Sequence, residues 1–137
     1  EVLLSTRLKY LLVVLEETGE GGREALLRLR PSSAALLAAH SDLVGLIVLA
    51  AGDAGSSHDG YYRFFAPWAG LDEDPVTGSA AAVIAPYLAR RLGRESLGLR
   101  QDSRRGGELR VVFQGERVKI SGQSVVTVEG KIVVPTK

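Results

Sequence analysis

Apolar stretches alternate along the chain with polar, glycine-rich segments, and this pattern predicts where the strands lie. Long unbroken apolar runs are typical of strands buried on both faces, whereas alternation is typical of strands with one exposed face. Short glycine-containing segments between the later runs favour hairpins and argue against a doubly wound parallel sheet. The predicted strands cover residues 8–16, 43–51, 61–65, 97–101, 108–113, 117–121 and 124–134.

Three helices complete the predicted arrangement. Alanine and leucine dominate residues 23–40, where Pro31 separates two helices and Ser32 or Ser33 is placed to cap the second. Apolar residues recur at helical spacing over residues 80–92, the longest predicted helix. About seven mostly antiparallel strands and a central helix predict an α+β fold.

Composition narrows the classes of function. Residues 1–137 are 45% hydrophobic and 24% charged, so we expect one globular domain. The 17 basic and 16 acidic residues give a net charge of +1, which argues against a nucleic-acid partner. The lack of cysteine excludes disulfides, thiolate metal sites and a cysteine nucleophile. The longest apolar run is too short to span a membrane and no signal peptide is seen, so we expect a cytoplasmic protein.

The loop before the longest predicted helix has the most reactive composition. Residues 71–80 read L-D-E-D-P-V-T-G-S-A, with three acidic residues before a proline and a Thr-Gly-Ser step at the helix start. Pro75 favours an extended conformation at Asp74 and so fixes the direction of its carboxylate. Gly78 permits a sharp turn or a close approach to a ligand, and Ser79 adds a hydroxyl group.

The start of this helix predicts an anion site. The backbone amides of Gly78, Ser79 and Ala80 carry partial positive charge there, which suits a carboxylate or phosphate. A neighbouring carboxylate such as Asp74 fits proton transfer on a small acid. The same residues are also explained without a ligand, because Thr and Ser commonly cap helices and acidic residues favour helix N-termini. On the residues alone, both interpretations stay open.

Five segments resemble a known family in their order and spacing. They are F-F-A-P-W-A-G-L-D-E-D-P-V-T-G-S-A (64–80), V-I-A-P-Y-L (83–88), R-R-G-G-E-L-R-V (104–111), V-K-I-S-G-Q-S-V (118–125) and V-E-G-K-I (128–132). Together they resemble the C-terminal lobe of the PhzF-like, or phenazine biosynthesis-like, isomerases. The resemblance implies a diaminopimelate-epimerase-like fold, in which a sheet wraps around a central helix.

The resemblance also implies a mechanism and a site. In this family two pseudo-symmetric lobes enclose a cleft, where a proton is moved on a small carboxylated substrate without a cofactor or a metal. Asp74 and Ser79 match the catalytic aspartate and serine of the D-P-x-T-G-S motif. Thr77, Gly78, Ser79 and Ala80 match its substrate-binding segment, with the amides of Gly78 and Ser79 expected on the substrate carboxylate.

The chain departs from the family in what it lacks. The G-N-P-A and G-H-A-T segments of the N-terminal lobe, and its acid/base glutamate, have no counterpart in the sequence. Ala81 and Asp102 stand where many members have histidine and cysteine. We therefore expect an isolated or engineered half of an isomerase or epimerase, inactive unless a second lobe or a second copy, as in a homodimer, joins it.

Other residues suggest alternative sites. His40 and His58 lack the local spacing of a metal site, and a Ser79–His58–Asp74 triad rests on residue type alone. Four arginines fit a phosphate site or a solvated turn, and five aromatic residues fit a ligand pocket or core packing. These residues are Arg100, Arg104, Arg105 and Arg110, and Tyr61, Tyr62, Phe64, Phe65 and Trp68.

Two further classes of function compete with the isomerase half. One is a non-catalytic domain that self-associates. The other is a small-anion binding module that uses the helix start at Gly78–Ala80.

Overall fold

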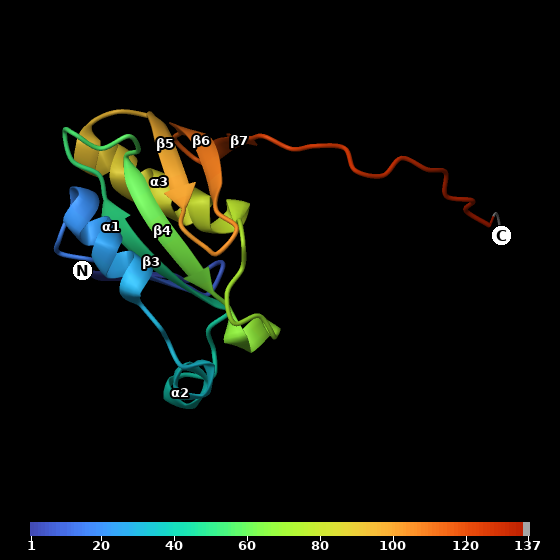
Figure 1. The fold of residues 1–137 in the computed structure, drawn as a ribbon, viewed down its shortest axis with the longest axis horizontal. Coiled ribbons are helices and arrows are strands. Elements are labelled where there is room, and N and C mark those ends of the chain that lie inside the picture. The colour runs from blue at the N-terminus through green and yellow to red at the C-terminus, as the bar shows by residue number, and fades with distance from the viewer. Residues whose placement is uncertain (136–137) are drawn as a thin grey trace.

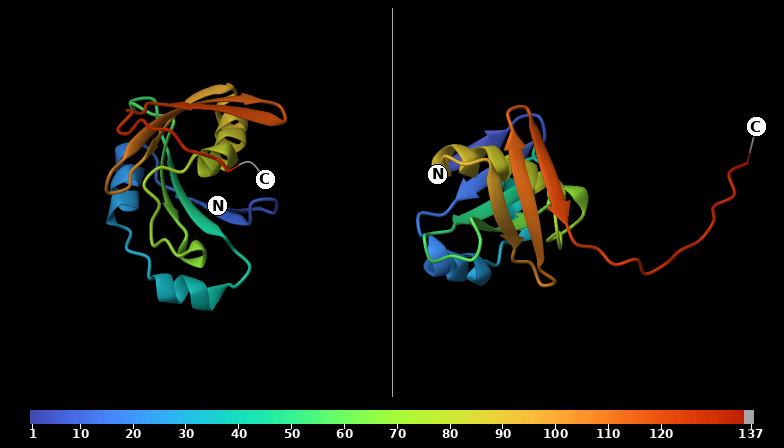
Figure 2. Two further views of the ribbon diagram at one scale, coloured as in Figure 1. Left: turned by 90° about the vertical axis from the view of Figure 1, so that its right-hand side faces the viewer. Right: turned by 90° about the horizontal axis from the view of Figure 1, so that it is seen from above.

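A computed structural model of the protein describes residues 1–135, and within them seven strands form one curled sheet around a helix (Figure 1; Figure 2). The order of the strands in the sheet is their order along the chain, so β1 and β7 lie at its two ends. The strands are β1 (Val2–Ser5), β2 (Tyr10–Val14), β3 (Gly45–Ala51), β4 (Gly60–Phe65), β5 (Ser96–Gln101), β6 (Gly107–Gln114) and β7 (Arg117–Gly122). The helices are α1 (Gly19–Arg28), α2 (Ser33–Ala39), the short 3₁₀ helix η1 (Pro67–Ala69) and α3 (Gly78–Leu92).

The sheet is mixed, with four antiparallel and two parallel pairings among the described strands. The parallel pairs are β2–β3 and β4–β5. Each parallel pair needs a long crossover, which α1 and α2 supply for the first and η1 and α3 for the second. This confirms the predicted α+β class, with mostly antiparallel strands wrapped around a central helix.

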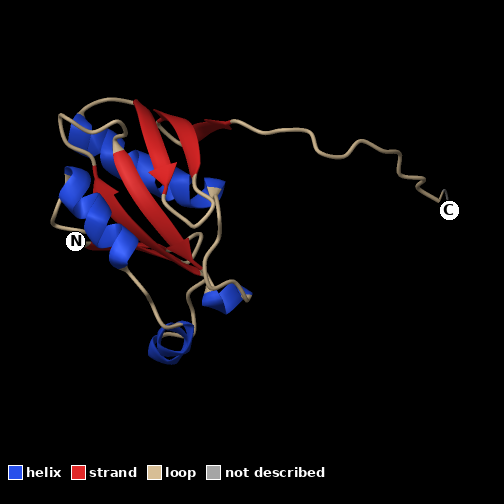
Figure 3. Ribbon diagram, viewed as in Figure 1, coloured by secondary structure: helices blue, strands red, loops and turns tan. Residues whose placement is uncertain are grey.

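Two clusters of buried side chains lie on the two faces of the sheet. The larger one packs α3 against the concave face, where small alanines let the helix approach the strands closely. The smaller one lies under α1 on the other face. Figure 3 shows helices on both sides of the central strands, which explains why β4 is aromatic on both faces. Along β4, Tyr62 and Phe64 belong to the larger cluster and Tyr61 and Phe65 to the smaller one.

The helix ends follow their local chemistry. Ser32 caps α2 by accepting a hydrogen bond from the amide of Ala35 at 3.3 Å, as predicted. Gly93 ends α3 in the left-handed conformation, with φ of 66°. α3 begins two residues earlier than predicted, at Gly78, and it accommodates Pro86 in its interior. Among the described residues, no helix has both the length and the apolar character needed to cross a membrane.

The N-terminal prediction needs correction. The segment predicted as one strand over residues 8–16 forms strand only at Tyr10–Val14, and the separate strand β1 was missed. Lys9 has φ of 54°, a left-handed value that makes the tight turn between these two strands. α1 also begins before its predicted start, because Gly19, with φ of 60°, turns the chain into the helix.

The prediction of a last strand over Ser124–Val134 is wrong in this structure. Residues 123–135, called the tail segment below, are not in any strand and run away from the body of the molecule (Figure 1). Their side chains are exposed, including Val128 at 87% and Ile132 at 92%. A strand needs a neighbour for its backbone hydrogen bonds, and an apolar pattern alone does not supply that neighbour.

We expect Ile84→Ala to lower the free energy of unfolding by about 2–5 kcal/mol, because Ile84 of α3 is fully buried in the larger cluster. Leu92→Ala, near the exposed end of the same helix, is the matched control and should cost under about 1 kcal/mol. Urea unfolding followed by circular dichroism measures both. Equal losses in the two variants would contradict the central packing assigned to α3.

Candidate functional site

The loop before α3 is tied to the sheet at several points. It leaves β4 through η1, where Ala66 and Leu71 form an isolated antiparallel bridge. The amide of Asp74 donates to the carbonyl of Phe64 at 3.0 Å. These backbone contacts hold the loop beside β4 and bring Asp74 to the start of α3.

The structure separates the three acidic residues of the loop by their partners. Asp72 accepts a hydrogen bond from the Ser33 hydroxyl at 2.5 Å and so ties the loop to α2. The Glu73 carboxylate forms a two-point pair with Arg63, at 2.7 and 2.9 Å. Asp74 alone is directed to the helix start, where its Oδ2 accepts the Thr77 hydroxyl hydrogen bond.

Arg63 is a buried anchor of this loop. Its guanidinium lies on the face of the sheet covered by α1, with 8% of the residue exposed, and it also donates to the carbonyls of Leu26 and Leu29 at 3.1 and 2.9 Å. The end of α1 and Glu73 are therefore joined through one cation. Because this buried guanidinium bonds to a carboxylate of the loop and to carbonyl groups at the end of α1, it holds the loop in one position relative to the sheet.

Gln101, at the end of β5, is the residue that links Asp74 to Thr77. Its side chain is fully buried, and its Oε1 accepts the amide of Thr77 at 2.6 Å. Its Nε2 donates to the Asp74 carbonyl at 2.5 Å and lies 3.3 Å from the Thr77 hydroxyl. The sequence prediction missed Gln101, because a single glutamine at a strand end carries no signal of what it contacts.

Buried Tyr62 holds the same loop from below. Its hydroxyl donates to the carbonyl of Thr77 at 3.2 Å. Burial, and to a smaller extent the charge of Asp74, raises the pKa of the Tyr62 phenol well above its usual range. The phenol is therefore a stable neutral donor at this position.

The helix start is not capped by its own threonine. Thr77 occupies the cap position, but its hydroxyl bonds to Asp74 and makes no capping hydrogen bond to α3. Within residues 1–135, the amides of Gly78, Ser79 and Ala80 have no acceptor, and the first helical bond comes from Ala81 to the Thr77 carbonyl at 3.3 Å. The interpretation of Thr77 as a simple helix cap is thus not supported by the geometry.

Space is open beside these amides. A side chain built at Gly78 would meet no atom within 4 Å, and the glycine has no left-handed φ that would require it for a turn. A sharp turn is therefore not the reason for this glycine, and the close approach of a ligand stays a prediction. Ser79 is exposed and Gly78 is half-buried, whereas the whole Ala80 residue, its backbone included, is buried.

The Ser79 hydroxyl has a partner that the sequence did not reveal. It lies 3.0 Å from the hydroxyl of Tyr10 on β2, a residue 69 positions earlier in the chain. The ring of Tyr10 packs edge-on against Phe64, with the centroids 4.9 Å apart. Tyr10 thus places a second hydroxyl group at the start of α3, and its position within an apolar run gave no hint of this.

The structure brings the predicted residues together. Thr77, Gly78, Ser79 and Ala80 form the first turn of α3 and its cap, and Asp74 contacts this cap through Thr77. The triad with His58 is not formed in the described part of the chain. His58 Nδ1 pairs with the Ser57 hydroxyl at 2.9 Å, while Ser79 pairs with Tyr10.

The other candidate groups have contacts of their own. His40 Nδ1 accepts the amide of Asp42 at 3.1 Å, and residues 1–135 contain no group of three or more side chains able to hold a metal. Arg100 forms ion pairs with Asp102 and Glu108. The four aromatic residues of β4 are in the core, whereas Trp68 is half-buried and donates to the His40 carbonyl at 2.6 Å.

Asp102 and Ala81, the two departures from the family pattern, are both buried. The Asp102 carboxylate accepts from Arg23 of α1 and Arg100 of β5, each at 2.7 Å. The two guanidinium groups supply the hydrogen bonds that water would otherwise give this carboxylate. They also hold the end of β5, where Gln101 is the residue before Asp102. Ala81 is fully buried on α3 and faces the core.

Comparison with known proteins identifies the class of this domain. It superimposes on the crystal structure of a PhzF-family phenazine biosynthesis protein from Enterococcus faecalis with a TM-score of 0.75 and 37% identity, over 89% of this chain and 42% of that one. A family model described as phenazine biosynthesis-like protein (PhzC-PhzF) matches residues 2–130. The chain belongs to this family.

Two curated relatives show how much of a family member this chain represents. "Uncharacterized isomerase PA3578" of Pseudomonas aeruginosa is 47% identical over 122 residues, which cover 89% of this chain and 43% of that protein. Mouse "Phenazine biosynthesis-like domain-containing protein 1" is 34% identical over 136 residues, which cover 96% of this chain and 47% of that protein. The chain spans less than half the length of these relatives.

Replacing Gln101 by leucine should lower the free energy of unfolding by about 1–3 kcal/mol, because the buried amide of Thr77 would lose its acceptor. Gln114→Leu, on an exposed position of β6, is the matched control and should change stability by less than about 0.5 kcal/mol. Chemical unfolding measures both variants. Amide exchange at Thr77 should also accelerate in the first variant only, and unchanged exchange there would contradict the role given to Gln101.

Raising the pH should destabilise the protein through Tyr62. The folded state keeps this phenol protonated, whereas in the unfolded chain it ionises at about pH 10. The contribution of Tyr62 to the free energy of unfolding is therefore complete below that pH and decreases above it. The slope contributed is up to about 1.4 kcal/mol per pH unit. Tyr62→Phe should remove this part of the alkaline slope, whereas Tyr87→Phe should not. Urea midpoints measured between neutral and alkaline pH make the comparison, and identical slopes in all three proteins would refute it.

Proposed function

We propose that this chain is the C-terminal lobe, and so half, of a cofactor-independent PhzF-like isomerase or epimerase that moves a proton on a small carboxylated substrate. One observation carries the proposal. The amides of Gly78, Ser79 and Ala80 have no acceptor in the described residues, with Ser79 exposed at the start of α3, and the Asp74 carboxylate is held next to this start by Thr77 and Gln101. Family membership and the name of the Pseudomonas aeruginosa isomerase support the same conclusion.

Each part of the site has a separate task in this proposal. The helix amides bind the substrate carboxylate, because they combine hydrogen-bond donors with the positive end of the helix dipole. The hydroxyl groups of Ser79 and Tyr10, 3.0 Å apart, contact polar atoms of the substrate. Asp74 directs or accepts the moving proton. Thr77 and Gln101 hold Asp74 in position through their hydrogen bonds.

The proton-transfer partner comes from outside this lobe. The resemblance places the acid/base glutamate of the family on the other lobe, so a second lobe or a second copy of this chain has to face the start of α3. A positioned acid or base commonly contributes about 10²–10⁴-fold to the rate. A lone lobe would therefore bind a carboxylate but catalyse poorly.

The open amides also favour a second candidate function, that of a small-anion binding module. Binding alone needs the helix start but not the Asp74 carboxylate, whose charge opposes a bound anion. The two functions are thus separated by the consequence of removing that charge.

Ser79→Ala should weaken the binding of acetate about tenfold, because one hydrogen bond to a charged group is lost. Binding is measured by NMR titration of the amide signals of residues 78–80. Ser41→Ala, at an exposed position after α2, is the matched control and should bind acetate as the parent does. Equal affinity in all three proteins would remove Ser79 from the site.

Asp74→Asn distinguishes the isomerase from the binding module. This variant should bind acetate as well as the parent or better, because a negative charge next to the anion is removed. Deuterium incorporation from D₂O into carbon positions of a panel of small unsaturated carboxylic acids, at millimolar chain concentration, should fall at least about 100-fold. Measurable deuterium incorporation that is equal in the parent and in the Asp74→Asn variant would remove Asp74 from the proton transfer and contradict the role given to it.

A further inference from the structure

Tyr10, at the start of β2, is directed toward the candidate site by packing. Its ring contacts the larger buried cluster and meets Phe64 edge-on, with the centroids 4.9 Å apart and the ring planes at 61°. The Phe64 ring occupies the space next to Gly45, where a Cβ atom would come within 2.2 Å of it. Gly45 is also the residue that pairs with Tyr10 between β2 and β3. A glycine at this position therefore makes room for the ring against which Tyr10 packs.

The Tyr10 hydroxyl has one hydrogen-bond partner in residues 1–135, and that partner is the Ser79 hydroxyl. The two oxygen atoms are 3.0 Å apart. A serine in a helix often donates to the carbonyl four residues earlier, but here the Pro75 carbonyl accepts from the Ser103 hydroxyl at 2.6 Å. The remaining hydrogen-bonding capacity of Ser79, an exposed residue, is thus available to a ligand.

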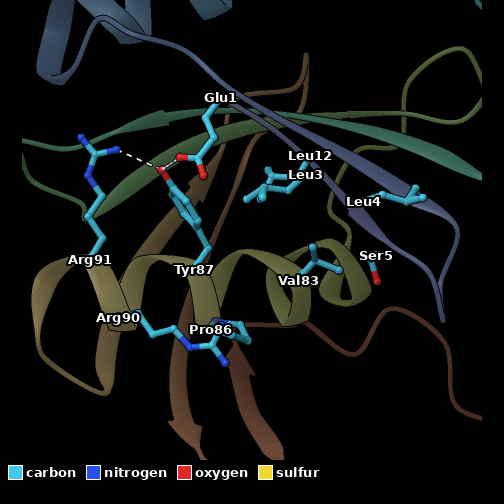
Figure 4. Close-up of a pocket in the computed structure, with 10 residues that line it drawn as sticks. All are labelled: Glu1, Leu3, Leu4, Ser5, Leu12, Val83, Pro86, Tyr87, Arg90 and Arg91. Carbon is cyan, nitrogen blue, oxygen red and sulfur yellow. Dashed lines mark hydrogen bonds between the residues drawn. The ribbon is translucent and has the colours of Figure 1, made fainter.

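Tyr87, near the middle of α3, has a different arrangement. Its hydroxyl donates to the Glu1 carboxylate at 2.9 Å and accepts from the Arg91 guanidinium at 3.1 Å (Figure 4). The phenol of Tyr87 is therefore used in both directions within the chain. The Tyr10 phenol contacts only a second hydroxyl group in the described residues, and that group lies at the start of α3.

The chemistry of the two hydroxyl groups decides the direction of their hydrogen bond. A phenol is a stronger acid than an aliphatic alcohol, and its oxygen is a poorer acceptor because its lone pairs are delocalised into the ring. Tyr10 is therefore the donor and Ser79 the acceptor. The Ser79 hydrogen is left for a ligand, and the bond received from Tyr10 polarises the serine hydroxyl and makes it a stronger donor.

We propose that Tyr10 is a specificity-determining residue of this site, which acts by holding the Ser79 hydroxyl in the role of a donor. The Ser79 hydroxyl and the backbone amides of Gly78 and Ser79 are then all donors. A carboxylate only accepts and satisfies them, whereas a carboxamide of the same shape sets its own NH₂ group against them. Within the proposed function, on which this inference rests, Tyr10 selects substrates that present an ionised carboxylate to Ser79.

Tyr10→Phe tests this selection, because it keeps the ring against Phe64 and removes only the hydroxyl group. Acetate and acetamide, which have the same shape, are titrated by NMR on the amide signals of residues 78–80. In Tyr10→Phe the dissociation constant of acetate should rise about fivefold. That of acetamide should stay the same or fall, because the Ser79 oxygen is free to accept from the NH₂ group. Tyr87→Phe is the matched control and should keep both constants of the parent.

The outcomes separate this inference from the function proposed above. If the ratio of the two dissociation constants is the same in Tyr10→Phe as in the parent, whether both ligands bind equally well or both are weakened, Tyr10 has only a structural role. That result would overturn the inference and leave the proposed anion site in place. A parent chain that binds no acetate at residues 78–80 would contradict the anion site itself, and this inference with it.

The direction of the hydrogen bond can also be measured without a ligand. The chain has four tyrosines, so subtracting the Raman spectrum of Tyr10→Phe from that of the parent isolates the ring doublet of Tyr10. The relative intensity of the two bands differs between a phenol that donates a hydrogen bond and one that accepts it. We expect the donor pattern in the parent and its loss in Ser79→Ala. An acceptor pattern in the parent would overturn the inference without affecting the roles proposed for Asp74 and the helix amides.

Discussion

A fully buried amide, that of Gln101, joins the sheet to the loop that carries the site. Its two ends bond in opposite directions, one accepting the Thr77 amide and the other donating to the Asp74 carbonyl. A buried amide of this kind is costly to leave unpaired, so the loop can depart from its position only by exposing or breaking several bonds at once. The geometry between Asp74 and the start of α3 depends on this constraint.

The contacts around Gln101 extend that constraint to both faces of the sheet. Asp102, the next residue, is held by cations from α1 and β5, and Arg63 joins the end of α1 to Glu73 of the loop. Three elements that are distant in the sequence therefore meet at the base of one loop. As a result, the helix start is held from the sheet side by these contacts, and its first three amides have no acceptor in the described residues.

Much of the fold follows from local patterns. The continuous apolar run of β3, the aromatic run of β4, the alternating hairpins and the glycine after α3 each predicted an element that the structure contains. The site loop was also predictable, because Asp74 and the Thr-Gly-Ser step are adjacent in the sequence. Tyr10, Gln101 and Arg63 were not, because their roles come from contacts with residues 10 to 69 positions away.

By itself, the sequence determined the α+β class, the long helix, the family resemblance and the residues at the start of α3. Only the tertiary structure decided that Asp74, rather than Asp72 or Glu73, faces the helix start, and that Thr77 bonds to Asp74 instead of capping α3. It also showed that the valine-rich tail segment has no strand neighbour in its own described sheet. The physical reason is common to all three: periodicity records which faces are apolar, whereas a hydrogen bond is decided by which partner the folded chain brings within reach.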